Sequence, residues 1–261
     1  MTGAIDMISE TPRQPRAASA QLTLELAPAP GFERDNFIIS SSNEQAYAMI
    51  ELWPGWPDPM LLILGPPGSG KSHLGTIWAA IAKAAIQPAA SLAGADIDAL
   101  ASAGPLLLED ADAIGESEAR LFHLVNLMRE RDTALVITAK TPPDAWGLRT
   151  ADLLSRLRLA PAVALGPPDD ALMRAVLVKL LVERQLVVDT SVVGYIALRL
   201  ERSLGAARAF IDALDREAMA RQRRISRAMA ADVLRSMEGS EEQGFLPGES
   251  SGPAGSSGDR S

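Results

Sequence analysis

The stretch LLILGPPGSGKSHL, residues 61–74, decides the fold. It runs from an apolar segment of strand type through a glycine-rich turn into a helix-forming segment. The pattern G-x-x-x-x-G-K-[ST] is satisfied by Gly65, Gly70, Lys71 and Ser72. Glycines let consecutive backbone N–H groups surround phosphate oxygens, and the N-terminus of the following helix adds partial positive charge. The stretch therefore predicts a phosphate-binding loop between a buried strand and a helix.

The side chains of this loop predict a site for a nucleotide and a metal ion. Lys71 can reach the β- and γ-phosphates, and the Ser72 hydroxyl can ligate Mg²⁺. The predicted cofactor is ADP or ATP with Mg²⁺, and a glycine-rich turn without a ligand is the alternative. We assign cofactor binding to the loop and the start of its helix: Gly65, Pro66, Pro67, Gly68, Ser69, Gly70, Lys71, Ser72 and His73.

An acidic element follows in the segment PLLLED, residues 105–110. An apolar strand that ends in carboxylates places negative charge beside the Mg²⁺ ion, where it holds the metal or orients water. We therefore assign catalytic roles to Glu109 and Asp110, with Glu109 as a metal ligand beside Ser72. Alternatively, the two carboxylates cap the strand end or the next helix. Because the first acid is Glu rather than the shorter Asp, hydrolysis of ATP by the chain itself stays open.

Strand and helix signals alternate through the first part of the chain, which predicts an α/β fold with a parallel sheet and helices on both faces. A weak strand is expected at AASLAG, residues 89–94. From Pro168 onward the strand signals fade and four amphipathic helices follow. Their predicted N-caps are Asp169, Asp189, Ser203 and Ser226.

Composition bounds the class of protein. The chain has 261 residues, 47% of them hydrophobic, a formal net charge of −8, two histidines and no cysteine. This composition predicts a globular protein without disulfides or thiolate metal sites. No apolar run is long enough to cross a membrane and the start does not have the pattern of a signal peptide, so we expect a cytoplasmic location and no membrane partner.

Both ends are rich in Ser, Gly, Pro and charge, which predicts disordered tails. We divide the chain into an N-terminal segment, a nucleotide-binding α/β domain, a helical domain and an acidic tail at residues 1–35, 36–167, 168–237 and 238–261. The segment QLTLEL, residues 21–26, stands alone between the N-terminal residues and a Pro-rich run. It is either a half-buried strand or an extended peptide for a groove, and its flanks favour the peptide.

These pieces together resemble the AAA+ nucleotide-binding proteins, and more closely the DnaA family of replication initiators, over residues 36–237. The resemblance rests on NFIISSSNEQAYAMI (36–50), GPPGSGKSHL (65–74), LLLEDAD (106–112), ALVITAKTPP (134–143), LLSRLRLAPAVALGPPDD (153–170) and SLGAARAFIDALDRE (203–217). It implies a P-loop AAA+ parallel sheet flanked by helices, followed by a small all-helical lid domain.

The resemblance also implies roles for two arginines. Arg156 matches the arginine finger, which stabilises charge on the γ-phosphate of a neighbouring subunit, and Arg149 and Arg158 are nearby alternatives. Arg208 matches the second phosphate sensor of the lid, with Arg202 as the competing residue.

Other positions match the family in part. The family's γ-phosphate sensor falls on the stretch that holds Thr138 and Lys140, and Lys140 departs from the usual small or acidic polar residue. An adenine pocket is expected in the segment before the loop, with Phe37, Ile38, Ile39 and Asn43. The stretch from Arg216 to Arg227 is basic, and a solvated helix face is favoured there over a contact with DNA or an acidic partner.

The peptide at residues 21–26 resembles the clamp-binding peptide of bacterial sliding-clamp partners, in which a glutamine amide bonds at the rim of the pocket and leucines fill an apolar cleft. The matching residues are Gln21, Leu22, Leu24 and Leu26.

The resemblance thus implies a DnaA-related regulator that inhibits the initiation of chromosome replication. It would hold ADP or ATP, dock on the DNA polymerase sliding clamp and present Arg156 to ATP bound by the initiator DnaA. Because the helix-turn-helix domain of a full initiator is missing from this sequence, sequence-specific DNA binding is not expected, and a homodimer stays open. The alternative is a DNA-dependent AAA+ ATPase, such as a helicase loader or an initiator-like motor, and a small-molecule P-loop kinase is a remote third.

Overall fold

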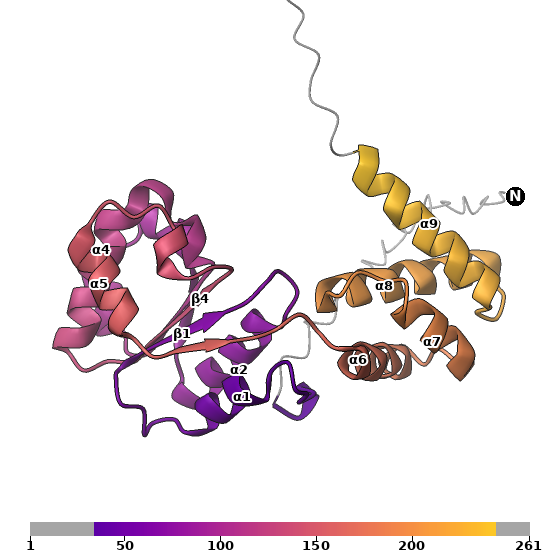
Figure 1. Cartoon of the computed structure of the whole chain (residues 1–261), viewed down its shortest axis with the longest axis horizontal. Coiled ribbons are helices and arrows are strands. Elements are labelled where there is room, and N and C mark those ends of the chain that lie inside the picture. The colour runs from indigo at the N-terminus through magenta and orange to yellow at the C-terminus, as the bar shows by residue number, and fades with distance from the viewer. Residues whose placement is uncertain (1–33, 244–261) are drawn as a thin grey trace, which may run out of the picture. The chain divides into compact units, whose positions relative to one another are not determined.

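The computed structural model describes residues 34–243 (Figure 1). The peptide at residues 21–26 and the end of the predicted acidic tail lie outside the described residues. The described chain begins with a 3-10 turn at Arg34–Asn36 and helix α1 at Glu44–Glu51. In this part of the chain five strands form one sheet in the order β2-β3-β4-β1-β5.

All strand pairs in the sheet are parallel. The strands are β1 (Met60–Leu64), β2 (Ala85–Pro88), β3 (Leu106–Glu109), β4 (Leu135–Ala139) and β5 (Ala162–Ala164). In register, Leu64 of β1 lies opposite Ala139 of β4, and Leu108 of β3 lies opposite Ile137. The carboxyl ends of β1, β4 and β3 therefore meet at one edge of the sheet, which is where ligands bind in open α/β folds.

Helices connect these strands, as the alternation in the sequence predicts. They are α2 (Lys71–Ala82), α3 (Ile97–Ser102), α4 (Glu118–Glu130) and α5 (Ala151–Leu159). The weak strand expected at residues 89–94 was wrong, because Ala89–Gly94 forms a 3-10 helix and the strand lies earlier, at β2. Ala89 and Leu92 are buried in the core from this 3-10 helix, so its apolar residues reflect packing and not a strand.

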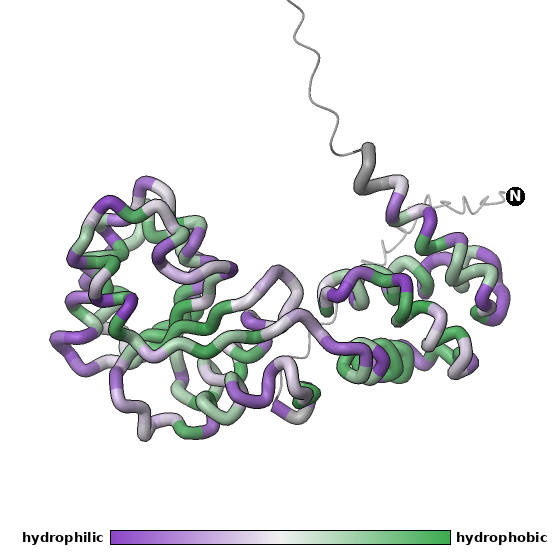
Figure 2. The backbone as a smooth tube through the Cα atoms, viewed as in Figure 1, coloured by the Kyte–Doolittle hydropathy of each residue, from purple (hydrophilic) through white to green (hydrophobic). Residues whose placement is uncertain are grey.

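The apolar run of β1 is continuous because both faces of the strand are covered. Met60 and Leu62 belong to the cluster that α4 and α5 cover, whereas Leu61 and Ile63 belong to the cluster that α1 and α2 cover. Figure 2 shows the hydrophobic residues along the central strands β1 and β4. Each fully buried leucine contributes about 1.5–3 kcal/mol to this core.

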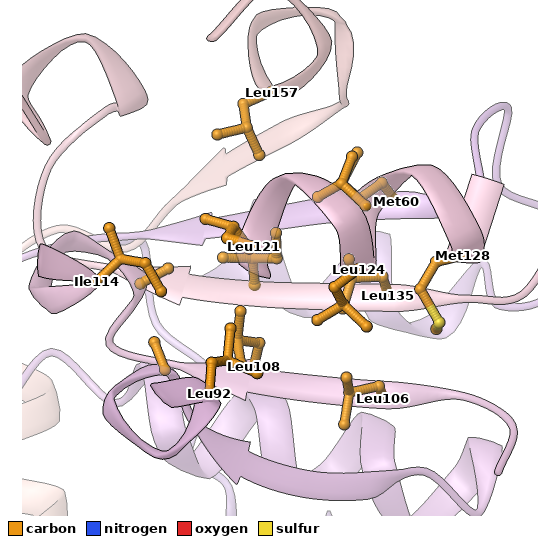
Figure 3. Close-up of a cluster of buried hydrophobic side chains, with 14 of the residues drawn as sticks. Met60, Leu92, Leu106, Leu108, Ile114, Leu121, Leu124, Met128, Leu135 and Leu157 are labelled. Carbon is orange, nitrogen blue, oxygen red and sulfur yellow. The ribbon is translucent and has the colours of Figure 1, made fainter. Parts of the chain in front are cut away.

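The face covered by α4 is drawn in Figure 3. There Leu121, Leu124 and Met128 project from α4 onto side chains of the strands. The strand residues beneath them are Met60, Leu106, Leu108 and Leu135. The spacing of the α4 residues is three to four positions, so one face of the helix is apolar and the sheet buries it.

The last part of the described chain is helical. It consists of α6 (Asp170–Glu183), α7 (Thr190–Ala197), α8 (Leu204–Arg221) and α9 (Arg227–Gln243). These helices enclose a second cluster that contains the buried side chains of Leu177, Ile196 and Phe210. Helix α9 continues past residue 237, where we expected the helical domain to end, to Gln243.

The four predicted N-caps are confirmed. The side chains of Asp169, Asp189, Ser203 and Ser226 accept hydrogen bonds from backbone N–H groups two or three residues later. Such caps satisfy donors that have no partner within the helix. Within residues 34–243, no helix has the length and apolar character needed to span a membrane.

Candidate functional site

The glycine-rich loop joins the end of β1, at Leu64, to the start of α2, at Lys71. Its backbone needs glycine for two reasons. Gly68 has a φ of +69°, and a Cβ atom there would lie 1.9 Å from Ser203 Oγ. A Cβ on Gly65 would lie 2.6 Å from the carbonyl oxygen of Leu165. The loop therefore combines a left-handed backbone conformation with close approach of neighbouring segments, which only glycine tolerates.

Lys71 lies at the centre of the loop with only 7% of its surface exposed. Its ammonium donates hydrogen bonds to the carbonyl oxygens of Gly65, at 2.7 Å, and Pro66, at 2.9 Å. Burial lowers the pKa of Lys71, and the nearby carboxylates of Asp110 and Asp112 partly offset that effect. The ammonium is thus satisfied by the loop itself and can exchange these carbonyl groups for phosphate oxygens.

The edge of the sheet brings the acidic element to the same region as the loop. Asp110 follows β3 with a φ of +55°, and its N–H donates to Thr138 Oγ1 of β4 at 3.1 Å. Glu109 Oε1 is buried without a hydrogen-bond partner among the described residues, and so is Ser69 Oγ in the loop. Buried polar atoms without partners are costly. These two oxygens are therefore suited to a ligand that brings donors or a cation.

The predicted metal ligands can be tested against the groups present. Within residues 34–243, no group of three or more His, Asp or Glu side chains could hold a metal ion. Ser72 is exposed at the start of α2, and Glu109 ends β3. Mg²⁺ usually keeps several waters and binds through one or two protein groups together with substrate phosphates. The described side chains therefore form no metal cage of their own, and a role of Ser72 and Glu109 as metal ligands would depend on an ion that arrives with a nucleotide.

The two residues of the sensor stretch have different environments. Thr138 is 1% exposed and accepts the Asp110 N–H. Lys140 is half-exposed, its N–H donates to Asp112 Oδ1 at 2.9 Å, and its ammonium lies 3.9 Å from Asp112 Oδ2. Thr138 is therefore fixed within the sheet edge, whereas the charge of Lys140 is held by a neighbouring carboxylate.

The segment before the loop is ordered by Asn43, which is buried. Its amide nitrogen donates to the carbonyl oxygen of Ile38 at 3.0 Å, and its amide oxygen accepts from the Ser40 N–H at 2.9 Å. The expected adenine residue Asn43 thus shapes the backbone of this segment with both ends of its side chain.

Aromatic rings connect the same segment to α2. Phe37 stacks on Tyr47 with ring centroids 5.3 Å apart, and it meets the ring of His73 edge-on at 5.2 Å. Ile39 is 52% exposed. Phe37 and His73, which belong to separate sequence motifs, are therefore neighbours. Tyr47 belongs to the same aromatic group through its stacking on Phe37, and no role was assigned to it from the sequence.

Arg156 lies on α5, on the side of the sheet that α4 and α5 cover. Its guanidinium forms an ion pair with Asp152 at 3.2 Å and lies 5.7 Å from the centroid of the Phe122 ring. The side chain is 37% exposed. An ion pair this exposed contributes about 0–1 kcal/mol, so a stronger anion can displace Asp152.

The two nearby alternatives differ from Arg156. Arg158 binds Asp144 through Nε at 2.9 Å and through a second guanidinium nitrogen, which raises the pKa of Arg158 and lowers that of Asp144. Arg149 is exposed, and its backbone N–H donates to the carboxylate of Glu118. Arg156 also donates from Nε and a second guanidinium nitrogen to Asp152, both at 3.2 Å, so Arg156 and Arg158 are each held by two bonds to one carboxylate. The Nε bond of Arg158 is the shorter of the two Nε bonds.

The second-sensor residues also differ. Arg208 is exposed on α8 and forms no ion pair with a described residue, whereas Arg202 pairs with Asp170 at 2.8 Å. The start of α8 touches the loop directly, since the Leu204 N–H donates to the Gly68 carbonyl oxygen at 2.8 Å. The sequence predicts Ser203 as the N-cap of α8 but does not predict its position against Gly68. A local sequence pattern does not indicate which distant segment a capping residue will contact.

The sheet order, the glycine-rich loop after β1 and the helices that follow are shared with known nucleotide-binding folds. The sequence matches no model of a protein family and no curated protein. Solved AAA+ structures do match it, and the chain has a DnaA-like AAA+ fold.

Three of these structures are similar over most of the chain. Domain III of the replication initiation protein DnaA from Thermotoga maritima has a TM-score of 0.70 and 20% identity, covering 80% of this chain and 97% of that one. AMPPCP-bound DnaA from Aquifex aeolicus has a TM-score of 0.62 and 20% identity, covering 75% and 69%. The Holliday junction branch migration motor RuvB from Thermotoga maritima has a TM-score of 0.61 and 16% identity, covering 78% and 71%.

Proposed function

We propose that this protein is a DnaA-related regulatory inactivator of the Hda type. In this proposal it binds ADP or ATP with Mg²⁺, docks on the DNA polymerase sliding clamp and stimulates ATP hydrolysis by the initiator DnaA. It would thereby act as a negative regulator of replication initiation in the cytoplasm. The observation that carries the proposal is the position of Arg156, a partly exposed side chain on α5 whose contacts are Asp152 of its own helix and the Phe122 ring.

Nucleotide binding is supported by the loop and the sheet edge. Lys71 would exchange its two carbonyl partners for phosphate oxygens, and Ser72 and Glu109 would bind Mg²⁺. The bound ion would neutralise charge on the phosphates. Arg208, exposed and without an ion pair among the described residues, is the cation available from α8 for the same ligand. A DnaA structure with a similar fold contains AMPPCP, a nucleotide analogue.

Action in trans is supported by where Arg156 lies. Helix α2, which begins at Lys71, covers one face of the sheet, and α5 covers the other. The contacts of Arg156 are Asp152 on its own helix and Phe122 on α4, with none to the glycine-rich loop. A guanidinium presented in this way fits the γ-phosphate of a nucleotide held by another molecule.

Hydrolysis by the chain itself is the point on which the alternative function depends. The carboxylates of Glu109 and Asp110 would have to orient water, and Glu109 is longer than the usual Asp at the first position. The Lys140 charge, held by Asp112, adds a cation beside this edge. We infer that the protein activates the ATPase of the initiator more than it hydrolyses ATP. A DNA-dependent ATPase that loads a helicase would instead show turnover by this chain alone, rising with DNA.

The test is a phosphate-release assay with ATP-loaded initiator, DNA-loaded clamp and this protein. We expect turnover of the initiator's ATP to rise when all three are present, and Arg156→Ala to abolish the rise. Arginine fingers contribute on the order of 10³-fold or more to the rate. Arg158→Ala removes a charge from the same helix and should leave most of the stimulation intact.

Two results would contradict the proposal. The first is wild-type protein that does not accelerate turnover beyond the initiator alone. The second is turnover by this chain alone that rises with added DNA, which would favour the helicase-loader function. Clamp binding by Arg156→Ala should be unchanged, so a lost signal cannot be attributed to lost docking.

A further inference from the structure

Seven arginines of the helical part form no ion pair with a described carboxylate, and four of them are grouped at the end of α7 and the connection between α8 and α9. Arg199 follows α7, Arg223 and Arg224 lie between α8 and α9, and Arg227 begins α9. All four are exposed, and none forms an ion pair with a described Asp or Glu. Chain length keeps the Cα atom of Arg224 within about 11 Å of that of Arg227. We call these four residues the arginine cluster.

Tyr195 of α7 holds two members of the cluster together. The guanidinium of Arg199 lies 4.0 Å from the centroid of the Tyr195 ring, and that of Arg227 lies 4.4 Å from it. Arg199 also donates to the Tyr195 carbonyl oxygen at 3.4 Å. These cation–π contacts place two positive charges on one aromatic ring. The sequence alone did not indicate an aromatic residue here, because Tyr195 comes from a different helix.

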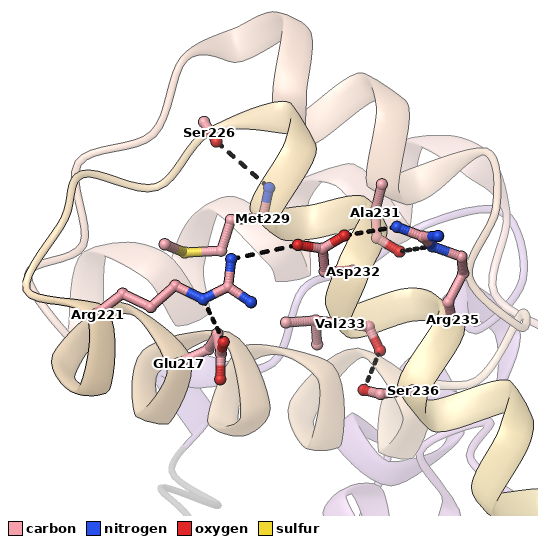
Figure 4. Close-up of polar contacts among 9 residues, drawn as sticks. All are labelled: Glu217, Arg221, Ser226, Met229, Ala231, Asp232, Val233, Arg235 and Ser236. Atoms are coloured by element: carbon pink, nitrogen blue, oxygen red, sulfur yellow. Dashed lines mark hydrogen bonds and ion pairs between the residues drawn. The ribbon is translucent and has the colours of Figure 1, made fainter.

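Neighbouring arginines are engaged differently, as Figure 4 shows. Arg221 binds Glu217 on α8 and Asp232 on α9, the latter at 3.2 Å, and Arg235 binds the same Asp232 at 2.5 Å. Arg221 therefore links α8 to α9, and this structural role is sufficient to explain the presence of an arginine at position 221. Within the basic stretch, Arg221 is thus neutralised by carboxylates of the fold, whereas Arg223, Arg224 and Arg227 are not.

Helix stability explains only part of the cluster. Arg199 and Arg223 lie just past the C-termini of α7 and α8, where a cation interacts favourably with the helix dipole. Arg227 lies at the first position of α9, where a cation is unfavourable, and the first turn of α9 contains no acidic residue. The fold gains no dipole energy from Arg227, and its contact with the Tyr195 ring leaves its guanidinium without a hydrogen-bond acceptor among the described residues, so the donors are available to an anion.

We propose that the arginine cluster binds the phosphodiester backbone of nucleic acid without reading its sequence. A guanidinium can bind a phosphate through two parallel hydrogen bonds, and every charged residue in the cluster is an arginine. The chain as a whole carries a net charge of −8, so a group of four arginines without carboxylate partners contrasts with that overall charge. The inference goes beyond the proposed function, since it concerns the protein without clamp or initiator.

Fluorescence anisotropy of a labelled 30-nucleotide DNA of mixed sequence, single-stranded and duplex, tests this inference with the full chain. If all four arginines contact phosphates, the slope of log K against log salt should be about −3.6 for duplex and about −2.8 for single strands. Arg223→Gln with Arg224→Gln should halve the slope. A control with the same loss of charge, Arg149→Gln with Arg174→Gln, should keep the wild-type slope, because these exposed side chains lie on other parts of the chain and form no hydrogen bond or ion pair with a described residue.

Thermal unfolding shows whether each variant is folded, and we expect equal midpoints because Arg223 and Arg224 are exposed in a loop. The inference would be overturned by absence of binding to both DNAs at about 50 mM salt, a regime in which phosphate contacts are strong. A double variant with the wild-type slope would also overturn it. Binding of poly-glutamate without binding of DNA would reassign the surface to an acidic protein.

Discussion

At the scale of single residues, the candidate site is shaped by contacts that tolerate little change. Gly68 combines a φ of +69° with a hydrogen bond that its carbonyl oxygen accepts from the Leu204 N–H. Thr138, which could have been an ordinary β-branched strand residue, accepts a hydrogen bond from the left-handed Asp110. These residues have different chemistry but the same effect, since each fixes backbone next to the place where phosphates would bind.

Gly68→Ala should destabilise the protein and weaken nucleotide binding. The new Cβ atom would overlap Ser203 Oγ, and alanine at this φ adds backbone strain, which together cost about 1–3 kcal/mol. Urea unfolding and titration with fluorescent ADP measure the two effects. Gly194→Ala in α7 is the matched control: nothing lies within 4 Å of its Cβ position, so it should be neutral or stabilise by up to about 1 kcal/mol. Wild-type behaviour of Gly68→Ala would contradict the close contact.

At the scale of elements, α5 depends on a side chain from another helix. Its own N-cap residue, Thr150, makes no side-chain capping bond. Instead Glu118, at the start of α4, accepts the N–H groups of Arg149, at 2.9 Å, and Thr150, at 2.6 Å. These hydrogen bonds to the charged form lower the pKa of Glu118. Because α5 contains Arg156, Glu118 helps to position the proposed arginine finger.

Glu118→Gln should lower the free energy of unfolding at pH 7 by about 1 kcal/mol, the usual value of a helix cap. The pKa of Glu118 is lower in the folded state than in the unfolded state. The stability that the charged Glu118 contributes is therefore fully present at a pH above the ordinary pKa of a glutamate, and it is lost as the pH falls through the lowered pKa of the folded state. The difference between wild type and variant should therefore shrink as the solution is acidified below the ordinary pKa of a glutamate. Urea unfolding at neutral and acidic pH measures it, with Glu116→Gln, an exposed neighbour, as the control. A difference independent of pH would exclude the charged cap.

At the scale of the whole molecule, the proposed function joins a folded part to a peptide outside the described residues. Residues 34–243 contain the glycine-rich loop, Arg156 and the arginine cluster, whereas the peptide at 21–26, for which we propose clamp binding, precedes them. The peptide would bring the protein to the sliding clamp, and Arg156 would stimulate ATP hydrolysis by the initiator. The two roles should then be separable by substitution.

Gln21→Ala combined with Leu24→Ala and Leu26→Ala should abolish clamp binding, because the amide and the two leucines are the groups that would enter the pocket. Binding of fluorescent ADP and the unfolding midpoint should not change. Thr23→Ala with Glu25→Ala alters the alternate positions of the same peptide and should retain clamp binding. Surface plasmon resonance on immobilised clamp measures both variants, and clamp binding by the triple variant would exclude this use of the peptide.

Much of the fold could be predicted from local patterns. The strand–loop–helix at residues 61–74, the alternation that follows and the four helix caps all depend on neighbouring residues, and the structure confirms them. The expected strand at residues 89–94 failed because a short apolar run satisfies a buried 3-10 helix as well as a strand. Periodicity over so few residues does not distinguish the two.

The sequence by itself determined the class of fold and the residue types of the glycine-rich loop, because a glycine pattern, a helix start and an apolar strand are local properties. Only the tertiary structure decided which residues meet across the chain: Glu118 capping α5, the α8 N-terminus on Gly68, and Tyr195 between Arg199 and Arg227. It also showed that Arg156 and Arg158 bind different carboxylates, Asp152 and Asp144, and that only Arg156 lies against the Phe122 ring. The contacts between different elements join residues that are far apart in the sequence. They are determined by tertiary packing, and packing produces no periodic pattern in the sequence from which they could be predicted.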